Sequence, residues 1–490
     1  MTMLPEAIYS AAQLRELERC AVRSGLSEIV LMQRAGRAAW EALRHRWPEA
    51  NRILVLAGSG NNAGDGYVLA HCAHQAGQEV TVLTVADSTR LKGAAAEARR
   101  IYLDSGAPEQ SFDRGLPETA HVLVDALLGT GLDRALSDNM LLAVTAINQS
   151  PLPVLALDIP SGLHADSGAI MGAAVQADIT FTFIALKPGL LTGAGPRCCG
   201  QVLFADLGVP AGCYAQGQPC ARRLLQGDAP LPKRARDAHK GAFGHVLVMG
   251  GDHGMGGAVR LTAEAALRTG AGLVTVATRT AHVSALLAGL PEAMACAVDF
   301  ADDIAALFER ASVIALGPGL GQGAWGQMLF AQALATTRPL VVDADALNLL
   351  AQAPRQRANW VLTPHPGEAG RLLGKDTAAV QADRYRAADE LVRRYSGVVV
   401  LKGAGSLVAA AGEPMAVCEH GNPGMAAPGM GDTLTGLIAA LIAQGFTPHH
   451  AARAGVYLHA VAGDRASLKG ERGLLARDLI AELRGLVNPP

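Results

Sequence analysis

Asp432 stands where an acid can act beside a phosphate. Gly429 and Gly431 lead into it, and the apolar segment DTLTGLIAALIAQG that follows is long enough for a helix. The first N–H groups of a helix have no partner within it and the helix dipole is positive there, so this start can hold a phosphate. A carboxylate beside it can take the proton from a hydroxyl that attacks a phosphoryl group. The alternative is that Asp432 only caps the helix.

Polar, glycine-rich segments follow other strands of the C-terminal half. They are GPGLG at residues 317–321, TPHPGE at 363–368 and KGAGS at 402–406. Ligands of open parallel sheets bind beyond the carboxyl ends of the strands, so these segments and Asp432 are the candidates for lining a pocket. His365, between two prolines, is either part of that pocket or a rigid turn residue.

The N-terminal half has its own glycine-rich turn, GSGNNAGDG at residues 58–66, between the strand RILVLA and a helix. Gly58, Gly60 and Ala63 match the dinucleotide-binding fingerprint loosely, and Asp87 ends the next strand where a ribose-binding acid would lie. The alternative is a tight turn without a ligand.

Ionisable residues end three further strands of this half. Because Asp125, Asp158 and Lys187 each close an apolar run, the three are predicted to converge on one pocket, although each alone also fits a solvated loop. Side-chain oxygens from the glycine-rich turn suit a cation or sugar hydroxyls in the same pocket. They belong to Asn61, Asn62 and Asp65.

The elements that must position these residues alternate between short β-rich runs and helix-length amphipathic segments. This alternation is typical of βαβ units in a parallel sheet. One series begins near residue 51 and a second at residue 244, and the two share no obvious period. The intervening residues 210–236 are rich in Gly, Pro and Gln, which places a domain boundary near Gly227. Two α/β domains are predicted, residues 1–225 and 228–490.

Composition limits the function classes. At 490 residues the chain exceeds what one hydrophobic core usually serves. The net charge of −2 provides no basic surface for nucleic acid, and no apolar run is long enough to span a bilayer. The first residues have the charges of an amphipathic helix rather than a signal peptide, so a cytoplasmic enzyme is expected. The eight cysteines show no CxxC pair and no metal-type spacing, which predicts free, buried or inert thiols.

Residues 9–208 resemble the NAD(P)H-hydrate (NAD(P)HX) epimerase domain, a YjeF-like domain with a Rossmann-like fold. The resemblance rests on YSAAQLRELE, LMQRAG, GNNAGDG, DALLGTGL, DIPSGL and LKPG, in the family's order. It implies interconversion of the R and S hydrates of NADH and NADPH at C6 of the nicotinamide ring. Asp158 would be the acid/base residue at the ring, assisted by Lys187. The family's usual loop reads GNNGGDG, so Ala63 replaces a glycine.

The same resemblance implies two sets of binding residues in this domain. Potassium would be bound by Asn62, Asp125 and Ser161, with carbonyls of the Gly129 loop. The substrate would be bound by Asn61, Asn62, Ala63, Gly64, Asp65, Gly129, Thr130, Gly131, Leu132, Asp133, Arg134, Ala135 and Asp158.

Residues 228–486 resemble the ADP-dependent NAD(P)H-hydrate dehydratase, a relative of ribokinase-like small-molecule kinases. The motifs HKGAFGHVLVMGG, GPGLG, DADALNLL, TPHPGE, LKGAGS and GMGD occur in family order. Asp432 would activate the C6 hydroxyl for phosphorylation. The implied hydrate site is Ala258, Gly319, His365 and Asp432, and the implied nucleotide site is Lys402, Gly403, Ala404, Gly405, Ser406 and Gly431. Ala427-Pro428 and Met430 depart from the family's usual motif, and proline removes one N–H donor.

The two resemblances predict a bifunctional repair enzyme. Its first domain would epimerise NAD(P)HX, and its second would dehydrate the S form while ADP is converted to AMP and phosphate. K⁺, Mg²⁺ and ADP are implied as cofactors and co-substrate. The implied partners are NADHX, NADPHX and ADP, in a homo-oligomer without nucleic acid or membrane.

Three other functions stay open at this stage. A vitamin-precursor kinase would keep its phosphorylated product, but TPHPGE, DADALNLL and the fused N-terminal domain argue against it. The N-terminal domain alone would be a non-catalytic binding module if Asp158 and Lys187 do no chemistry. A nicotinamide-dependent oxidoreductase fits the loose fingerprint, but no hydride-acceptor site is apparent.

Overall fold

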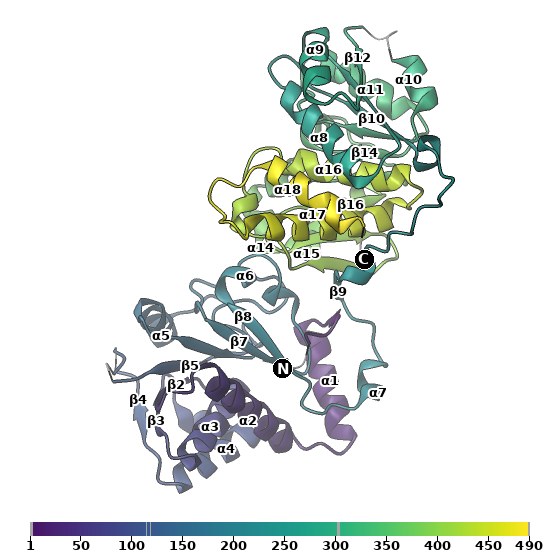
Figure 1. Ribbon diagram of the computed structural model, residues 1–490. Coiled ribbons are helices and arrows are strands. Elements are labelled where there is room, and N and C mark those ends of the chain that lie inside the picture. The colour runs from purple at the N-terminus through teal and green to yellow at the C-terminus, as the bar shows by residue number, and fades with distance from the viewer. Residues whose placement is uncertain (1–2, 114, 118, 301–303, 489–490) are drawn as a thin grey trace. The chain divides into compact units, whose positions relative to one another are not determined.

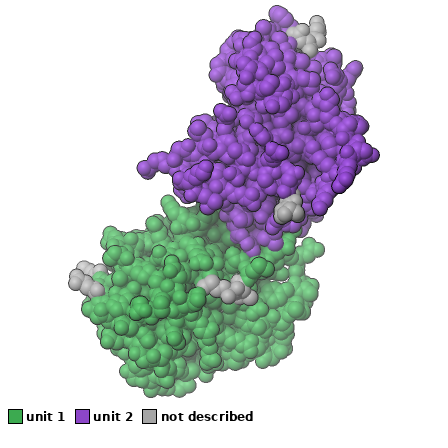
Figure 2. Space-filling view, viewed as in Figure 1, with its two compact units in different colours: residues 1–222 green, residues 223–490 purple. Residues whose placement is uncertain are grey.

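The computed structural model describes residues 3–113, 115–117, 119–300 and 304–488. The chain divides into two compact units, residues 1–222 and 223–490, coloured separately in Figure 2. The change of unit falls within strand β9 (Ala221–Arg223), a few residues before the predicted break at Gly227. The reason is that Leu224 N–H already donates to the Val417 carbonyl of the second unit's sheet, at 2.8 Å.

The first unit is a parallel sheet with the strand order β4-β3-β2-β5-β6-β7-β8. Its strands are β2 (Arg52–Ala57), β3 (Glu79–Thr84), β4 (Glu109–Ser111), β5 (Val122–Ala126), β6 (Val154–Leu157), β7 (Ile179–Phe183) and β8 (Gln201–Ala205), and a short β1 (Ala7–Ile8) pairs with β9. Its helices are α1 (Ala11–Arg23), α2 (Glu28–Arg46), α3 (Asn61–Gln75), α4 (Gly93–Asp104), α5 (Asp138–Gln149), α6 (Gly195–Cys198) and α7 (Ala211–Tyr214). Figure 1 shows α2, α3 and α4 on one face of the sheet and α5 on the other. Cover on both faces explains why the strands read as continuous apolar runs.

Local sequence sets the start of two helices that border the later site. Ser10 and Gln13 form a reciprocal capping box at the start of α1, so the first helix begins where its amphipathic pattern begins. Helix α3 begins directly after the β2 turn, with Gly60 as its N-cap. Gly58 is required in that turn, because a Cβ there would lie 1.9 Å from the Leu127 carbonyl oxygen. The turn after β2 therefore packs tightly on the loop after β5.

The second unit is a mixed sheet with the order β18-β17-β16-β15-β14-β13-β10-β11-β12. Its strands are β10 (His245–Met249), β11 (Leu273–Thr278), β12 (Met294–Ala297), β13 (Val313–Leu316), β14 (Leu340–Val342), β15 (Trp360–Leu362), β16 (Val398–Leu401), β17 (Ser406–Ala410) and β18 (Met415–Cys418). The last two strands are antiparallel to their neighbours, a feature the sequence pattern did not separate from the parallel series. The residues between β16 and β17 are too few for a crossover, so the chain turns back on itself.

The helices of the second unit cover its sheet, and α16 lies at the centre of the packing. They are α8 (Gly256–Thr269), α9 (Thr280–Gly289), α10 (Ala305–Arg310), α11 (Ala324–Ala335), α12 (Ala344–Gln352), α13 (Pro366–Leu373), α14 (Thr377–Ala382), α15 (Arg384–Tyr395), α16 (Met430–Ala443), α17 (Pro448–Ser467) and α18 (Ala476–Leu486). Helix α16 packs against α8 and α17 (Figure 1). A Cβ at Gly436 would lie 2.1 Å from the Thr262 carbonyl oxygen, so only glycine permits this approach to α8. The close packing fixes the position of Asp432 in the first turn of α16.

The prediction of free thiols was wrong for two of the eight cysteines. Cys20 of α1 and Cys213 of α7 form a disulfide across 193 residues of sequence. Spacing in the sequence reveals only motifs of neighbouring cysteines. Cys20 and Cys213 are far apart in the chain, and only the packing of α1 against α7 brings them together. The other six cysteines are free, and three of them, Cys198, Cys199 and Cys418, are buried. Within the described ranges, no helix has the length and apolarity needed to cross a membrane.

Candidate active sites

A cavity of about 830 Å³ lies beyond the carboxyl ends of β2, β5, β6 and β7 in the first unit. These four strands are neighbours in the sheet, so their following loops converge as predicted. Helices α1 and α2 supply the remaining wall. The predicted residues that line the cavity are Asn61, Asn62, Asp65, Gly129, Thr130, Gly131, Leu132 and Asp158. Outside the lining are Ala63, Gly64, Asp125, Asp133, Arg134, Ala135, Ser161 and Lys187.

Asp158 and Lys187 form an ion pair at the wall of this cavity. The Lys187 side chain is fully buried, whereas that of Asp158 is 14% exposed and faces the cavity. The ammonium also donates to Thr182 Oγ1 at 2.8 Å and to the Phe183 carbonyl at 3.0 Å. Asp158 has a φ of +65°, a strained conformation for a residue other than glycine. The fold therefore holds this carboxylate in one orientation, toward the space where a ligand enters.

Three more carboxyl groups border the cavity, those of Glu18, Glu28 and Asp65. Burial, together with the nearby carboxylates of Asp158 and Glu18, raises the pKa of Asp65 well above its usual range. Burial and Asp158 also raise the pKa of Glu18. Glu18 was not predicted from the sequence, because it is one charged residue on an amphipathic helix and no motif marks it. Only the packing of α1 over the cavity identifies it.

A cluster of oxygens lies directly behind the cavity. Ser161 donates to Asp125 from its backbone N–H at 2.8 Å and from Oγ at 2.6 Å. Burial raises the pKa of Asp125 to about 6 in spite of these hydrogen bonds. Asn62 donates from Nδ2 to the Leu128 carbonyl at 3.0 Å. Its Oδ1 is buried and has no hydrogen-bond partner among the described residues. The Leu128 carbonyl and Ser161 link Asn62 to the Asp125 carboxylate, and an unpaired buried oxygen in such a cluster is what a cation would complete.

Asp87, the residue that the loose dinucleotide-binding fingerprint would assign to a ribose, interacts instead with its neighbours in the chain. It accepts hydrogen bonds from the Thr89 N–H at 3.1 Å and from the Thr89 hydroxyl at 2.5 Å, and it pairs with Arg90 at the surface. It does not line the cavity. The loose dinucleotide fingerprint therefore describes the turn after β2, while Asp87 is in no position to bind a ribose in this cavity.

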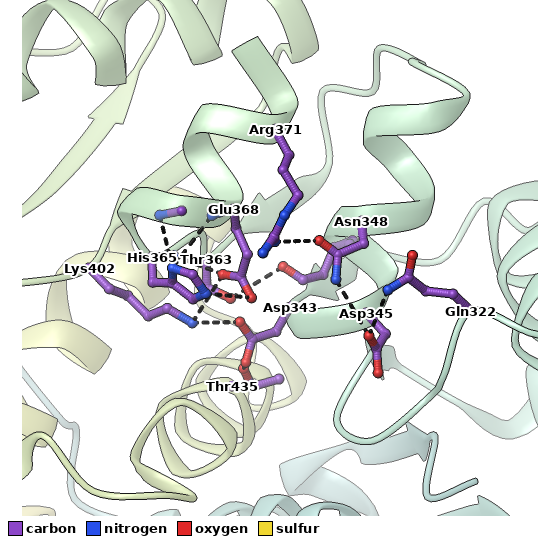
Figure 3. A network of polar contacts seen from close by, with 12 residues as sticks. Gln322, Asp343, Asp345, Asn348, Thr363, His365, Glu368, Arg371, Lys402 and Thr435 are labelled. Carbon is purple, nitrogen blue, oxygen red and sulfur yellow. Dashed lines mark hydrogen bonds and ion pairs between the residues drawn. The ribbon is translucent and has the colours of Figure 1, made fainter. Parts of the chain in front are cut away.

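In the second unit, a polar network joins the ends of β14, β15 and β16 (Figure 3). Lys402 donates to Asp343 Oδ1 at 2.7 Å and lies 3.8 Å from Glu368 Oε2. Thr435 of α16 donates to the other oxygen of Asp343 at 2.9 Å. Burial lowers the pKa of Lys402, but Asp343 and Glu368 outweigh it and the net shift is upward. The network therefore holds a charged ammonium at the sheet edge.

The start of α16 lies against this network. A Cβ at Gly431 would lie 3.3 Å from Lys402 Nζ, so the helix N-terminus and the ammonium face the same space. The N-cap is Gly429, which has no side chain to satisfy the first N–H groups. Asp432 is in the first turn rather than at the cap, so the capping alternative is wrong. An ammonium beside the first N–H groups of a helix is an arrangement that can bind a phosphate.

The Asp432 carboxylate is suited to accept a proton. No hydrogen bond to it is present within the described part of the chain. Burial, then the negative charge of Asp343, raises its pKa to about 6, although Lys402 acts in the opposite direction. A carboxylate with this pKa is ionised at neutral pH and is a stronger base than an exposed aspartate.

The other hydrate-site candidates fall into two groups. Gly319 has a φ of +57°, and a Cβ there would lie 3.4 Å from that of Ala258, so these two residues are neighbours. His365 accepts from the Gly367 and Glu368 N–H groups through Nδ1, at 3.0 and 3.4 Å. Burial, followed by Lys402 and Arg371, lowers the pKa of His365. His365 therefore caps α13, while Nε2 of its half-exposed ring lies 3.4 Å from Glu368 Oε1.

The nucleotide-site candidates 402–406 form the turn between β16 and β17. Gly403 and Ala404 are exposed at its tip, while Gly405 is buried. Ser406 Oγ accepts from the Gly403 N–H at 3.3 Å and donates to the Gly403 carbonyl at 3.0 Å. The turn is therefore preformed. Asp343 was not predicted as a site residue, although it directly follows the strand PLVV, the same position after a strand that marked Asp158.

The fold defines the class of protein: a two-unit α/β enzyme with a buried ion pair at a cavity in one unit and a lysine and an aspartate beside a helix N-terminus in the other. Comparison with known families agrees. Residues 28–189 match the family described as YjeF-related protein N-terminus, and residues 246–484 match NAD(P)H-hydrate dehydratase.

Full-length relatives extend these matches. A protein of Coxiella burnetii named bifunctional NAD(P)H-hydrate repair enzyme Nnr is 51% identical over 98% of this chain and 99% of its own length. The Escherichia coli protein of the same name is 44% identical over 99% and 95%. Among solved structures, the ADP/ATP-dependent NAD(P)H-hydrate dehydratase of Bacillus subtilis is 29% identical, with a TM-score of 0.49 over 54% of this chain and 97% of its own. The chain belongs to the family of bifunctional NAD(P)H-hydrate repair enzymes.

Proposed function

We propose that residues 1–225 epimerise R- and S-NAD(P)HX, and that residues 228–490 dehydrate the S form to NAD(P)H with conversion of ADP to AMP and phosphate. The observation that carries the proposal is Asp432, a base without a hydrogen-bond donor beside the free N–H groups of α16. The relatives named above and the two family matches support the same pair of activities. The homo-oligomeric assembly stays a prediction of the resemblance.

In the proposed dehydration, Asp432 takes the proton of the C6 hydroxyl. The hydroxyl oxygen then bonds to the terminal phosphorus of ADP, and the bond to the leaving AMP oxygen breaks. The α16 N-terminus and Lys402 stabilise the charge on the transferred group. Loss of phosphate from C6 and of a proton from C5 forms the ring double bond of NAD(P)H. Ala258, Gly319 and His365 would bind the hydrate, and the turn 402–406 with Gly431 would bind the nucleotide.

In the proposed epimerisation, Asp158 exchanges a proton with the C6 hydroxyl, and Lys187 holds the carboxylate in place. No redox cofactor is required, because the hydroxyl leaves and returns without a change in oxidation state. Asn61, Asn62, Ala63, Gly64, Asp65 and residues 129–135 would form the substrate site. Those of them that line the cavity would contact the substrate directly, and the others would shape the two turns.

Magnesium is proposed to enter with the nucleotide. Within the described residues, no group of three or more His, Cys, Asp or Glu side chains is arranged to hold a metal ion. Mg²⁺ is commonly held by one or two carboxylates together with substrate phosphates, so an all-protein cage is not needed. Bound in this way, the ion would neutralise part of the charge of ADP.

Potassium is proposed to bind behind the epimerase cavity, at Asn62 Oδ1, Asp125, Ser161 and a carbonyl of the Gly129 loop. The residues fit a hard cation, since all are oxygen donors and Asn62 Oδ1 is unpaired. Replacing sodium by potassium at equal ionic strength should raise the thermal midpoint of wild type, because a ligand that binds only the folded state stabilises it. Asn62→Ala should remove that difference. An unchanged difference in the variant would exclude Asn62 as a ligand.

One experiment tests the two activities together. A mixture of R- and S-NADHX is incubated with the enzyme, Mg²⁺ and ADP, and the absorbance of the reduced nicotinamide and the released phosphate are followed. Full conversion of both epimers, with one phosphate released for each NADH formed, is expected. A phosphorylated product that accumulates without phosphate release would replace the proposal by a kinase. Conversion of the S fraction alone at an appreciable rate would remove the epimerase activity.

A further inference from the structure

We infer that Arg384 is a positioning residue that sets the shape of the nucleotide turn 402–406, and that its charge helps to retain the anionic nucleotide. Arg384 is the first residue of α15 and lies outside every motif considered above. It is 1% exposed, although arginine is rarely buried to this extent unless its donors are satisfied. The inference rests on the proposed nucleotide site.

The Arg384 guanidinium is bonded to the turn itself. One terminal nitrogen donates to the carbonyls of Leu401, Lys402 and Gly405, at 3.2, 3.2 and 3.3 Å. These carbonyls lie on both sides of the exposed tip, so one planar group ties the two ends of the turn together. The other terminal nitrogen donates to Gln381 Oε1 at 2.9 Å, which anchors the guanidinium from the side of α14.

The backbone of the turn is adapted to this side chain. Gly403 has a φ of +134°, and a Cβ at that position would lie 3.0 Å from Arg384 Nη1. A side chain at residue 403 would thus both strain the backbone and press on the guanidinium. The turn and the arginine form one unit, and the backbone position of Lys402 depends on it. Lys402 in turn carries the ammonium that faces the α16 N-terminus.

Charge gives Arg384 a second effect. Its four acceptors named here are neutral oxygens, three carbonyls and one amide. Burial lowers its pKa to about 10, so the group stays protonated at neutral pH. A positive charge behind the turn attracts the phosphates of a nucleoside diphosphate in front of it, where the low dielectric of the interior strengthens the interaction.

The test compares Arg384→Lys and Arg384→Met with wild type in dehydration of purified S-NADHX. Lysine keeps the charge, but its single ammonium has three donors for the four acceptors and lacks the planar fork that reaches Gln381 and the turn together, so the KM for ADP should rise roughly tenfold, the equivalent of one charged hydrogen bond. Arg384→Met should raise it further and by more than it lowers kcat, which falls only as far as Lys402 shifts, while the KM for S-NADHX changes less than about twofold. The matched control is Arg386→Lys. Arg386 is an exposed arginine on the same helix, and within the described residues its ion-pair partners are Asp383 and Glu390.

A purely structural role would give a different result. Both Arg384 variants would then lose thermal stability with the KM for ADP unchanged, and the inference would be overturned. If Arg384→Met does not fold, the lysine variant is assayed for its thermal shift on addition of ADP, which should be smaller than that of wild type. Failure of the proposed function is distinguishable, since wild type itself would then show no ADP-dependent conversion.

Discussion

Asp432→Asn is expected to abolish dehydration and leave epimerisation intact. Asparagine has nearly the same shape but cannot accept the C6 hydroxyl proton, so the rate should fall about 10²- to 10⁴-fold, the usual contribution of a general base. The assay follows reduced nicotinamide formed from purified S-NADHX with ADP and Mg²⁺. Asp389→Asn is the control, since Asp389 is an exposed carboxylate on α15 that pairs with Arg393. Retention of more than a tenth of the activity would show that another group accepts the proton.

The pH dependence of wild type tests the same assignment. The base must be ionised to act, and the pKa of Asp432 is raised to about 6. The kcat/KM for dehydration should therefore be level above pH 7 and fall about tenfold for each pH unit below 6. The residual kcat/KM of Asp432→Asn should not show this fall below pH 6.

Stability should change in the opposite direction to activity. The folded-state pKa of Asp432, about 6, is above the usual value of an aspartate, so the native state binds this proton more tightly than the unfolded state does. The associated stability is present at low pH and is lost as the pH rises through about 6. Asn avoids the ionised form, so Asp432→Asn should be more stable than wild type by about 1–3 kcal/mol near pH 8. The two proteins should converge near pH 4, as measured by thermal unfolding. An inactive variant that is more stable than wild type excludes unfolding as the reason for lost activity.

The sequence was most informative where chemistry follows directly from strand order. Asp158 and Lys187 were predicted to meet because each ends a strand, and parallel strands bring their carboxyl ends to one edge. The same rule places Lys402 near the start of α16. The order of the strands in the sheet is therefore enough to predict which residues meet. The structure adds the hydrogen-bond partners of each side chain.

The contacts that sequence pattern missed come from segments far apart in the chain. Glu18 reaches the cavity because α1 packs across it, and Arg384 reaches the nucleotide turn because α15 covers β17. The Cys20–Cys213 disulfide depends on the same packing of α1, against α7. None of these residues has a local signal, since helix packing angles are set by the complete core rather than by neighbouring residues.

The buried pair in the first unit gives the second large effect. Lys187→Met should lower the free energy of unfolding by about 3–5 kcal/mol, because it leaves the Asp158 carboxylate without its cation. Asp158→Asn should cost less, since an amide oxygen can still accept from Lys187, and asparagine tolerates the φ of +65° that this position requires. Alanine at residue 158 would add backbone strain and confuse the comparison.

The double variant separates the structural role of the pair from its catalytic role. In Asp158→Asn with Lys187→Met, no buried charge is left unpaired, so the double variant should be more stable than Lys187→Met alone. Epimerisation should nonetheless stay lost, because Asp158 is the group that exchanges the proton, with the rate of R-NADHX conversion reduced about 10²- to 10⁴-fold. Dehydration of S-NADHX by the same protein provides the internal control. If the double variant regained epimerisation together with its stability, the pair would be structural, and the acid/base group of this cavity would have to be sought in Asp65, Glu18 or Glu28, the other carboxyl groups that line it.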